Sequence, residues 1–262
     1  MLRRVDLCVV CTLLLVAAAC GGGSSTPKEG GQPAASTPAA VPEAPIPLPG
    51  ESTITGRITF EGTAPTPRVV RMDSDALCMP EGPNTSEVLV VGPDNGLQNV
   101  FVHVKDGLGD RTFPAPKTPV VLDQKGCKYS PHVFGAQVGQ PVKVLNSDPT
   151  LHNVHAIAKA NAEFNVGQSK KGMETIRTFD KPEIMVPFKC DVHGWMNAFA
   201  GIVPHPFFAV SKADGSFEIK GLPAGTYTLE AWHEKLGMQT TKVTVDGKTG
   251  AMTSFAFKGK PS

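Results

Sequence analysis

The stretch VPFKCDVHGWMNAFAG, residues 186–201, places three residues with affinity for soft metals at equal spacing. Cys190, His193 and Met196 follow one another at intervals of three residues. Thiolate suits reduced copper, imidazole suits both oxidation states of copper, and a thioether is the weak axial ligand of electron-transfer copper sites. The pattern therefore supplies most of such a site and leaves one imidazole to be found.

The upstream stretch VLNSDPTLHNVHAI offers two candidates for that imidazole, His152 and His155. Side chains alternate between the two faces of a strand, so these two rings should point in opposite directions. We assign His152 to the metal and leave His155 outside the ligand set. Singly, a histidine, methionine or buried cysteine is more often a structural residue. Together, His152, Cys190, His193 and Met196 predict one mononuclear type 1 copper site.

The elements that must position these residues are strands. Short β-branched and aromatic runs recur from residue 51 onward, punctuated by Gly, Pro, Asn and Asp, and no long amphipathic helix is evident. We expect an all-β fold built from sandwiches. Cys190 should end one strand, with His193 and Met196 in the loop that follows.

The start of the chain predicts export. Residues 1–19 combine a short basic start with an apolar run, which is the pattern of a secretory signal. Small residues before Cys20 resemble a bacterial lipobox, with Ala17 where that motif usually has Leu. Cys20 would then carry a lipid that tethers the protein to a membrane, and the alternative is an ordinary secreted protein. Gly21 is not acidic, which favours the outer over the inner membrane of the bacterial envelope, with the protein facing the periplasm.

Residues 20–50 are rich in Gly, Ser, Pro and Ala and predict a flexible linker after the lipid. The folded part keeps Cys78, Cys127 and Cys190. In an oxidising compartment Cys78 and Cys127 most simply form a disulfide. That pairing leaves Cys190 as a free thiol, which a bound metal would protect.

The charge of the chain is balanced, with a formal net charge of +1. No basic stretch is present that would bind nucleic acid, so no nucleic-acid partner is expected. The expected partners are redox proteins and, through the lipid, a membrane. No small-molecule substrate is expected.

Residues 118–206 resemble a cupredoxin, the fold of the small blue copper proteins, through VGQPVKVLNSD, HNVH and Cys-x2-His-x2-Met. The ligand spacing is similar to that of the amicyanin branch. The resemblance implies a Greek-key β-sandwich with His152, Cys190, His193 and Met196 as copper ligands, and Asn153 tying the two ligand loops together. It also implies that His193 reaches the surface in an apolar patch, with Trp195 and Phe199 as candidate lining residues. Trp195 could instead be core packing.

The segments STITGRITFEG, DGSF and GLPAGTYTL resemble the carboxypeptidase regulatory-like, or transthyretin-like, β-sandwich. We expect one such sandwich from 51–117 and 207–262 with the cupredoxin domain, 118–206, set into it; a tandem order is the alternative. The module implies no peptidase, because WHEKLG lacks the second histidine of a zinc-protease motif. His233 and Glu234 are expected to be an exposed pair at a strand end. The whole arrangement resembles methylamine-utilisation-like cupredoxins.

These features favour a one-electron carrier over three alternatives. A copper-trafficking module would have a more open or Met-rich site. A non-redox envelope protein would use its sandwich to bind a partner or a glycan, with the copper site incidental. A copper oxidase or reductase would need a second copper site, and the sequence shows no second His-rich cluster, so we do not expect an enzyme.

Overall fold

The structure is a computed structural model that describes residues 50–78 and 84–259. The predicted signal sequence, Cys20 and nearly all of the predicted linker lie outside the described residues. Within the described ranges the protein has sixteen strands and two short 3-10 turns, so the prediction of an all-β fold is confirmed. In the same part of the chain, no helix is long and apolar enough to cross a membrane.

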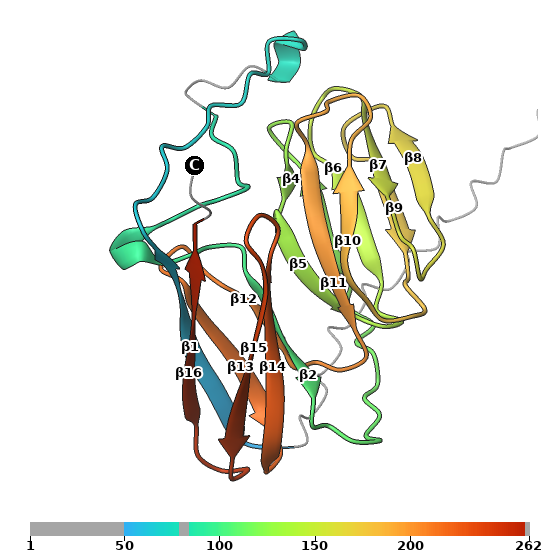
Figure 1. Ribbon diagram of the computed structural model, residues 1–262. Coiled ribbons are helices and arrows are strands. Elements are labelled where there is room, and N and C mark those ends of the chain that lie inside the picture. The colour runs from blue at the N-terminus through green and yellow to red at the C-terminus, as the bar shows by residue number, and fades with distance from the viewer. Residues whose placement is uncertain (1–49, 79–83, 260–262) are drawn as a thin grey trace, which may run out of the picture. The chain divides into compact units, whose positions relative to one another are not determined.

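Two sheets combine strands from both ends of the described chain (Figure 1). We call this pair of sheets the terminal sandwich. Its first sheet has the order β13-β1-β16, from Ser216–Leu222, Ser52–Glu61 and Ala251–Lys258. Its second sheet has the order β12-β2-β14-β15, from Phe208–Val210, Phe101–Asp106, Gly225–His233 and Gly237–Val245. A tandem order of domains would not join β1 to β16 in one sheet.

The other two sheets use the middle of the chain, and we call this pair the insert sandwich. One sheet has the order β5-β11-β10-β7-β8, from Val133–Gln137, Asn197–Val203, Glu183–Lys189, His152–Ala156 and Phe164–Gln168. The other has the order β4-β3-β6-β9, from Tyr129–Ser130, Val120–Gln124, Val142–Asn146 and Glu174–Arg177. Figure 1 shows β10, β11, β7 and β8 side by side in this part of the molecule.

Period-two patterning explains how these strands bury one face. In β6, Val142, Val144 and Asn146 are buried while Lys143 and Leu145 are only partly covered. The valines pack in a core with residues of the opposite sheet, including Phe188 of β10. The terminal sandwich has a separate core, which contains residues from β1, β13 and β16 on one side and β2, β14 and β15 on the other. Each sandwich therefore closes around its own apolar centre.

A small apolar cluster joins the two sandwiches. Phe101 of β2 is fully buried in it, with Val133, Met185 and Val203 of the insert sandwich. Its ring lies directly against Gly201, where an added Cβ would come within 2.3 Å of a ring carbon. A glycine in β11 is therefore required for this close approach.

A polar contact lies beside that cluster. His132 Nε2 is 2.8 Å from a carboxylate oxygen of Glu234, which follows β14. His233 is 1% exposed and accepts hydrogen bonds at Nδ1 from the backbone N–H groups of Lys235 and Leu236. The expectation of an exposed His233–Glu234 pair is therefore wrong: the histidine caps the β14–β15 turn and the glutamate is engaged by His132. The likeness of the terminal sandwich to the carboxypeptidase regulatory-like module stays a prediction.

Candidate metal centre

Strand pairing brings the predicted ligands from distant parts of the chain to one end of the insert sandwich. β7 and β10 are antiparallel neighbours, with Lys189 opposite His155. The start of β7, at His152, therefore lies beside the end of β10, where Cys190 follows. β10 and β11 are also antiparallel, and the loop between them carries His193 and Met196. This loop is closed by two backbone hydrogen bonds, from Met196 N to His193 O at 2.9 Å and from Cys190 N to Met196 O at 3.2 Å.

Three of the four predicted ligands present their donor atoms to one another. The Nδ1 atoms of His152 and His193 are 3.0 Å apart, and His193 Nδ1 is 3.9 Å from Cys190 Sγ. The three donors all lie within 4.8 Å of one another. The residues are 0%, 2% and 2% exposed, so water has little access to them. Met196 is buried in the same core cluster as Cys190, and its role as axial ligand stays a prediction.

Each of the two imidazoles has a carboxylate behind it. His152 Nε2 is 2.9 Å from Asp148 Oδ2, and His193 Nε2 is 3.0 Å from Asp75 Oδ2. A carboxylate accepts but does not donate when ionised, so each Nε2 carries the proton. In a neutral ring the other nitrogen, Nδ1, then holds an unshared electron pair. Burial lowers the pKa of His152 below its usual value of 6.5, which favours its neutral form.

This arrangement fits a cation. Two Nδ1 lone pairs that face each other at 3.0 Å repel unless a proton or a metal ion binds to them. Two imidazoles with carboxylates on their outer nitrogens are a common way of orienting metal ligands. A buried thiol completes the set, and thiolate with imidazole suits copper. The donor set therefore fits the predicted metal.

Backbone and side-chain donors hold the two carboxylates in place. Asp148 accepts from the N–H groups of Gly126 and Cys127, both at 2.8 Å. Asp75 accepts from Leu77 N at 2.9 Å and from Thr150 Oγ1 at 3.0 Å. The hydrogen bond from Leu77 N, followed by that from Thr150, lowers the pKa of Asp75, so this carboxylate is ionised at neutral pH.

Asn153 connects the two ligand segments, as the cupredoxin resemblance implies. Its Oδ1 accepts from Asp191 N at 2.6 Å and from Val192 N at 3.3 Å. These residues directly follow Cys190, so the side chain fixes the ligand loop to the start of β7. Cys190 Sγ itself accepts a hydrogen bond from His193 N at 3.3 Å. His155 lies on the other face of β7, where its ring contacts Asp191 and Glu163, as the sequence predicts.

The cysteines are arranged as expected from the sequence. Cys78 and Cys127 form a disulfide with a Cα–Cα distance of 5.4 Å. Among the described cysteines, Cys190 is free and buried. Two further groups of metal-type donors contain Cys78 or Cys127, and the disulfide removes those thiols as ligands.

No protein-family model matches the sequence, and no curated protein matches it. Similar solved structures include a Cu-containing nitrite reductase from Thermus scotoductus SA-01, with 22% identity, a TM-score of 0.31, and 36% of this chain and 24% of that chain covered. They also include a methionine-to-alanine mutant of amicyanin in its Cu(I) form, with 21% identity, a TM-score of 0.29, and 38% of this chain and 97% of that chain covered. An oxidised proline-to-glycine mutant of amicyanin gives 23% identity and a TM-score of 0.30, again with 38% and 97% covered. This chain thus matches about a quarter of the length of the nitrite reductase. At these values the likeness fixes neither family nor ligand, and the choice of metal rests on the donor atoms.

The expected surface patch around His193 is not formed. His193 is 2% exposed, and its outer nitrogen faces Asp75 and, at 3.6 Å, Cys78 Sγ. Phe199 packs against Trp232 with ring centroids 5.1 Å apart, at the contact between the sandwiches. The physical reason is the disulfide, which brings a segment from before β2 over the imidazole.

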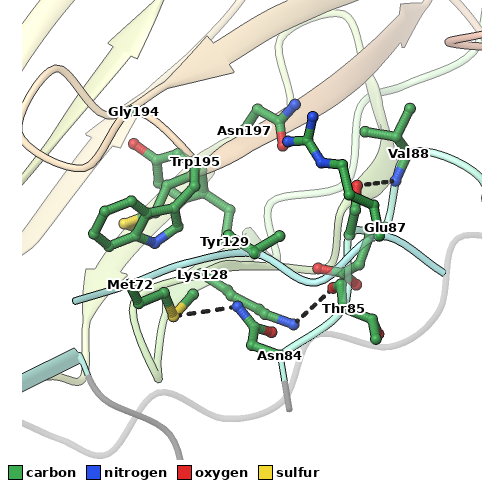
Figure 2. Close-up of a pocket in the computed structure, with 14 residues that line it drawn as sticks. Met72, Asn84, Thr85, Glu87, Val88, Lys128, Tyr129, Gly194, Trp195 and Asn197 are labelled. Atoms are coloured by element: carbon green, nitrogen blue, oxygen red, sulfur yellow. Dashed lines mark hydrogen bonds between the residues drawn. The ribbon is translucent and has the colours of Figure 1, made fainter. Parts of the chain in front are cut away.

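Trp195 links the site to the surface. Its ring centroid is 5.1 Å from that of His193, and its Nε1 donates to Cys127 O at 3.0 Å. Trp195 also lines a pocket of about 120 Å³ with Met72, Asn84 and Lys128 among its walls (Figure 2). The sequence left open whether Trp195 packs in the core or lies at the surface, and the residue does both.

Sequence reasoning missed the two carboxylates that orient the imidazoles. Asp148 could have been found, because it lies four residues before His152 in the same loop. Asp75 is 118 residues from His193 and belongs to no recognisable motif. The predicted disulfide was the one available signal that the region of residue 78 lies near the ligand loop.

Proposed function

We propose that this protein is a type 1 copper protein that carries single electrons between redox proteins. The observation that carries the proposal is the pair of Nδ1 atoms 3.0 Å apart beside a free buried thiol. Bound copper would supply a one-electron couple between its two oxidation states. His152, Cys190, His193 and Met196 would hold the copper ion.

The protein's own residues would keep reorganisation of the site small. Asp148 and Asp75 hold the two imidazoles by their outer nitrogens, and Asn153 holds the ligand loop against β7. Near-complete burial excludes water from the donors. A site whose ligands do not move between oxidation states favours fast electron transfer over substrate chemistry.

We propose a single mononuclear centre and no catalytic role. Among the described residues, the other donor clusters each depend on a cysteine that the disulfide occupies. The expected partners are redox proteins, and no nucleic acid or small-molecule substrate is proposed. We further propose that a lipid on Cys20 tethers the protein to the bacterial envelope, facing the periplasm, with the outer membrane favoured.

The test is to add oxidised copper to the purified full chain in detergent and to record the visible spectrum and a voltammogram. We expect an intense thiolate-to-copper charge-transfer band and a reversible one-electron wave. Cys190→Ser should abolish the band, because the sulfur is the source of the transition. His155→Ala is the matched control, since this ring lies on the same strand but faces away, and it should keep the band.

Two outcomes would contradict the proposal. A colourless protein that still binds copper would exclude a type 1 site. Tight binding of reduced copper with no reversible wave would favour a trafficking module instead.

A further inference from the structure

Residues 72–78, which we call the covering segment, cross the outer side of the metal centre. Met72 and Cys78 are each 4% exposed and belong to the core cluster that contains Cys190 and Met196. Cys78 is joined to Cys127 by the disulfide, and its Sγ lies 3.6 Å from His193 Nε2. Asn84 Nδ2 donates to Met72 Sδ at 3.2 Å (Figure 2). The segment is therefore anchored at both ends.

Asp75 lies in the middle of this segment and uses both carboxylate oxygens. Oδ1 accepts from Leu77 N at 2.9 Å, while Oδ2 accepts from Thr150 Oγ1 and His193 Nε2, each at 3.0 Å. The carbonyl oxygen of Asp75 accepts from Cys78 N at 3.0 Å. These contacts leave the carboxylate one orientation, directed at the imidazole. Its side chain is 23% exposed, so its charge is only partly screened by water.

The partner of the other imidazole shows what such a carboxylate does. Asp148 contacts His152 from within the same loop, four residues away, with the same outer-nitrogen geometry. Asp75 repeats that contact on His193 from a segment 118 residues distant. His152 is therefore oriented by a carboxylate that is close in sequence, and His193 by a carboxylate from a distant segment of the chain.

We propose that Asp75 is a positioning residue of the metal centre, holding the Nε2–H form and the ring orientation of His193 and placing a negative charge behind it. This inference rests on the proposed copper function. A carboxylate behind a ligand raises the basicity of that imidazole, and added negative charge stabilises the oxidised ion over the reduced one. Removing it should therefore favour the reduced state.

Two substitutions separate charge from orientation. Asp75→Asn keeps an oxygen that can accept from His193 but removes the charge. We expect it to shift the equilibrium about tenfold toward reduced copper, which is about 59 mV for one electron, with the charge-transfer band unmoved. Asp75→Ala also removes the acceptor, so both the potential and the band, together with the copper hyperfine splitting, should change.

Asp73→Asn is the matched control. It makes the same chemical change in the same segment, at a side chain that is 60% exposed and pairs with Arg71 instead of His193. The copper-loaded full chain is used for all variants, with midpoint potentials from spectroelectrochemistry and hyperfine splittings from electron paramagnetic resonance. We expect Asp73→Asn to match the wild type.

The outcomes distinguish this inference from the function on which it rests. A wild type without a charge-transfer band defeats the copper function itself. A coloured wild type whose Asp75→Asn and Asp75→Ala variants have the potential and spectrum of Asp73→Asn defeats the positioning role alone. If Asp75→Ala does not fold, the potential of the isosteric Asp75→Asn decides.

Discussion

The two sandwiches both bury histidines, but they use them differently. In the insert sandwich, His152 and His193 are held from behind by carboxylates, and their remaining nitrogens face each other. In the terminal sandwich, His205 donates from Nε2 to Val104 O at 2.8 Å and accepts at Nδ1 from Phe207 N at 3.2 Å. Both of its ring nitrogens are satisfied by backbone, as is Nδ1 of His233. Neither burial nor one unpaired nitrogen therefore marks a ligand, since the buried Nδ1 of His103 in β2 also has no partner. What distinguishes His152 and His193 is that their inner nitrogens face each other beside the Cys190 thiol.

The largest expected effect is on the charge-transfer band, when a predicted ligand of the insert sandwich is removed. His152→Ala removes one of the two facing nitrogens, so the type 1 charge-transfer band should be lost or replaced. His205→Ala removes an equally buried ring whose nitrogens are already paired. It should keep the band while lowering the free energy of unfolding by about 1–3 kcal/mol, because its backbone partners lose their hydrogen bonds. Loss of the band in His205→Ala alone would contradict the distinction.

Removing the disulfide tests whether the insert sandwich and the terminal sandwich unfold separately. The Cys78→Ser/Cys127→Ser double variant frees a loop with a sequence separation of 49, so unfolding free energy should fall by about 2–4 kcal/mol. The chain has two tryptophans, and Trp195 lies in the insert sandwich while Trp232 lies in the terminal sandwich. In the Trp232→Phe background, urea unfolding followed at Trp195 reports the insert sandwich. In the Trp195→Phe background, unfolding followed at Trp232 reports the terminal sandwich. An equal shift of both transitions would mean that the sandwiches unfold as one unit.

The pH dependence of stability tests the role of the buried histidines His205 and His233. Burial lowers the pKa of both His205 and His233 to about 4, with positive neighbours adding to the effect. The unfolded rings bind protons below about pH 6.5 and the folded rings do not, so stability is lost as pH falls from 6.5 toward 4. Each ring should cost about 1 kcal/mol per pH unit in that window.

The measurement is the urea midpoint at pH 7 and pH 5, followed at Trp232 in the Trp195→Phe background. His132 acts in the opposite sense: burial disfavours its charge, but Glu234, together with Glu87 and the backbone of Asn197, outweighs burial and raises the pKa of His132. Glu234→Gln should therefore steepen the loss at low pH. A midpoint that does not fall between pH 7 and pH 5 in this variant would contradict the role of the buried rings.

The strands and the convergence of His152, Cys190 and His193 could be predicted because their signals are local. Alternation along β6, the motif around Cys190 and the pairing of His152 with Asn153 lie within short stretches of sequence. The environment of His193 could not be predicted, because Asp75 reaches it across 118 residues through a disulfide-anchored turn. The position of Phe199 depends on Trp232 of the other sandwich in the same way. Contacts between distant segments leave no periodic trace in either segment.

The pairing of β1 with β16 has a consequence for biogenesis. β1 lies parallel to β16 and antiparallel to β13, so both of its neighbours are synthesised after all the strands of the insert sandwich. The strands of the insert sandwich are contiguous in sequence and can assemble first. Until β13 and β16 have been made, the edges of β1 lack their pairing partners and are open to pairing with another chain.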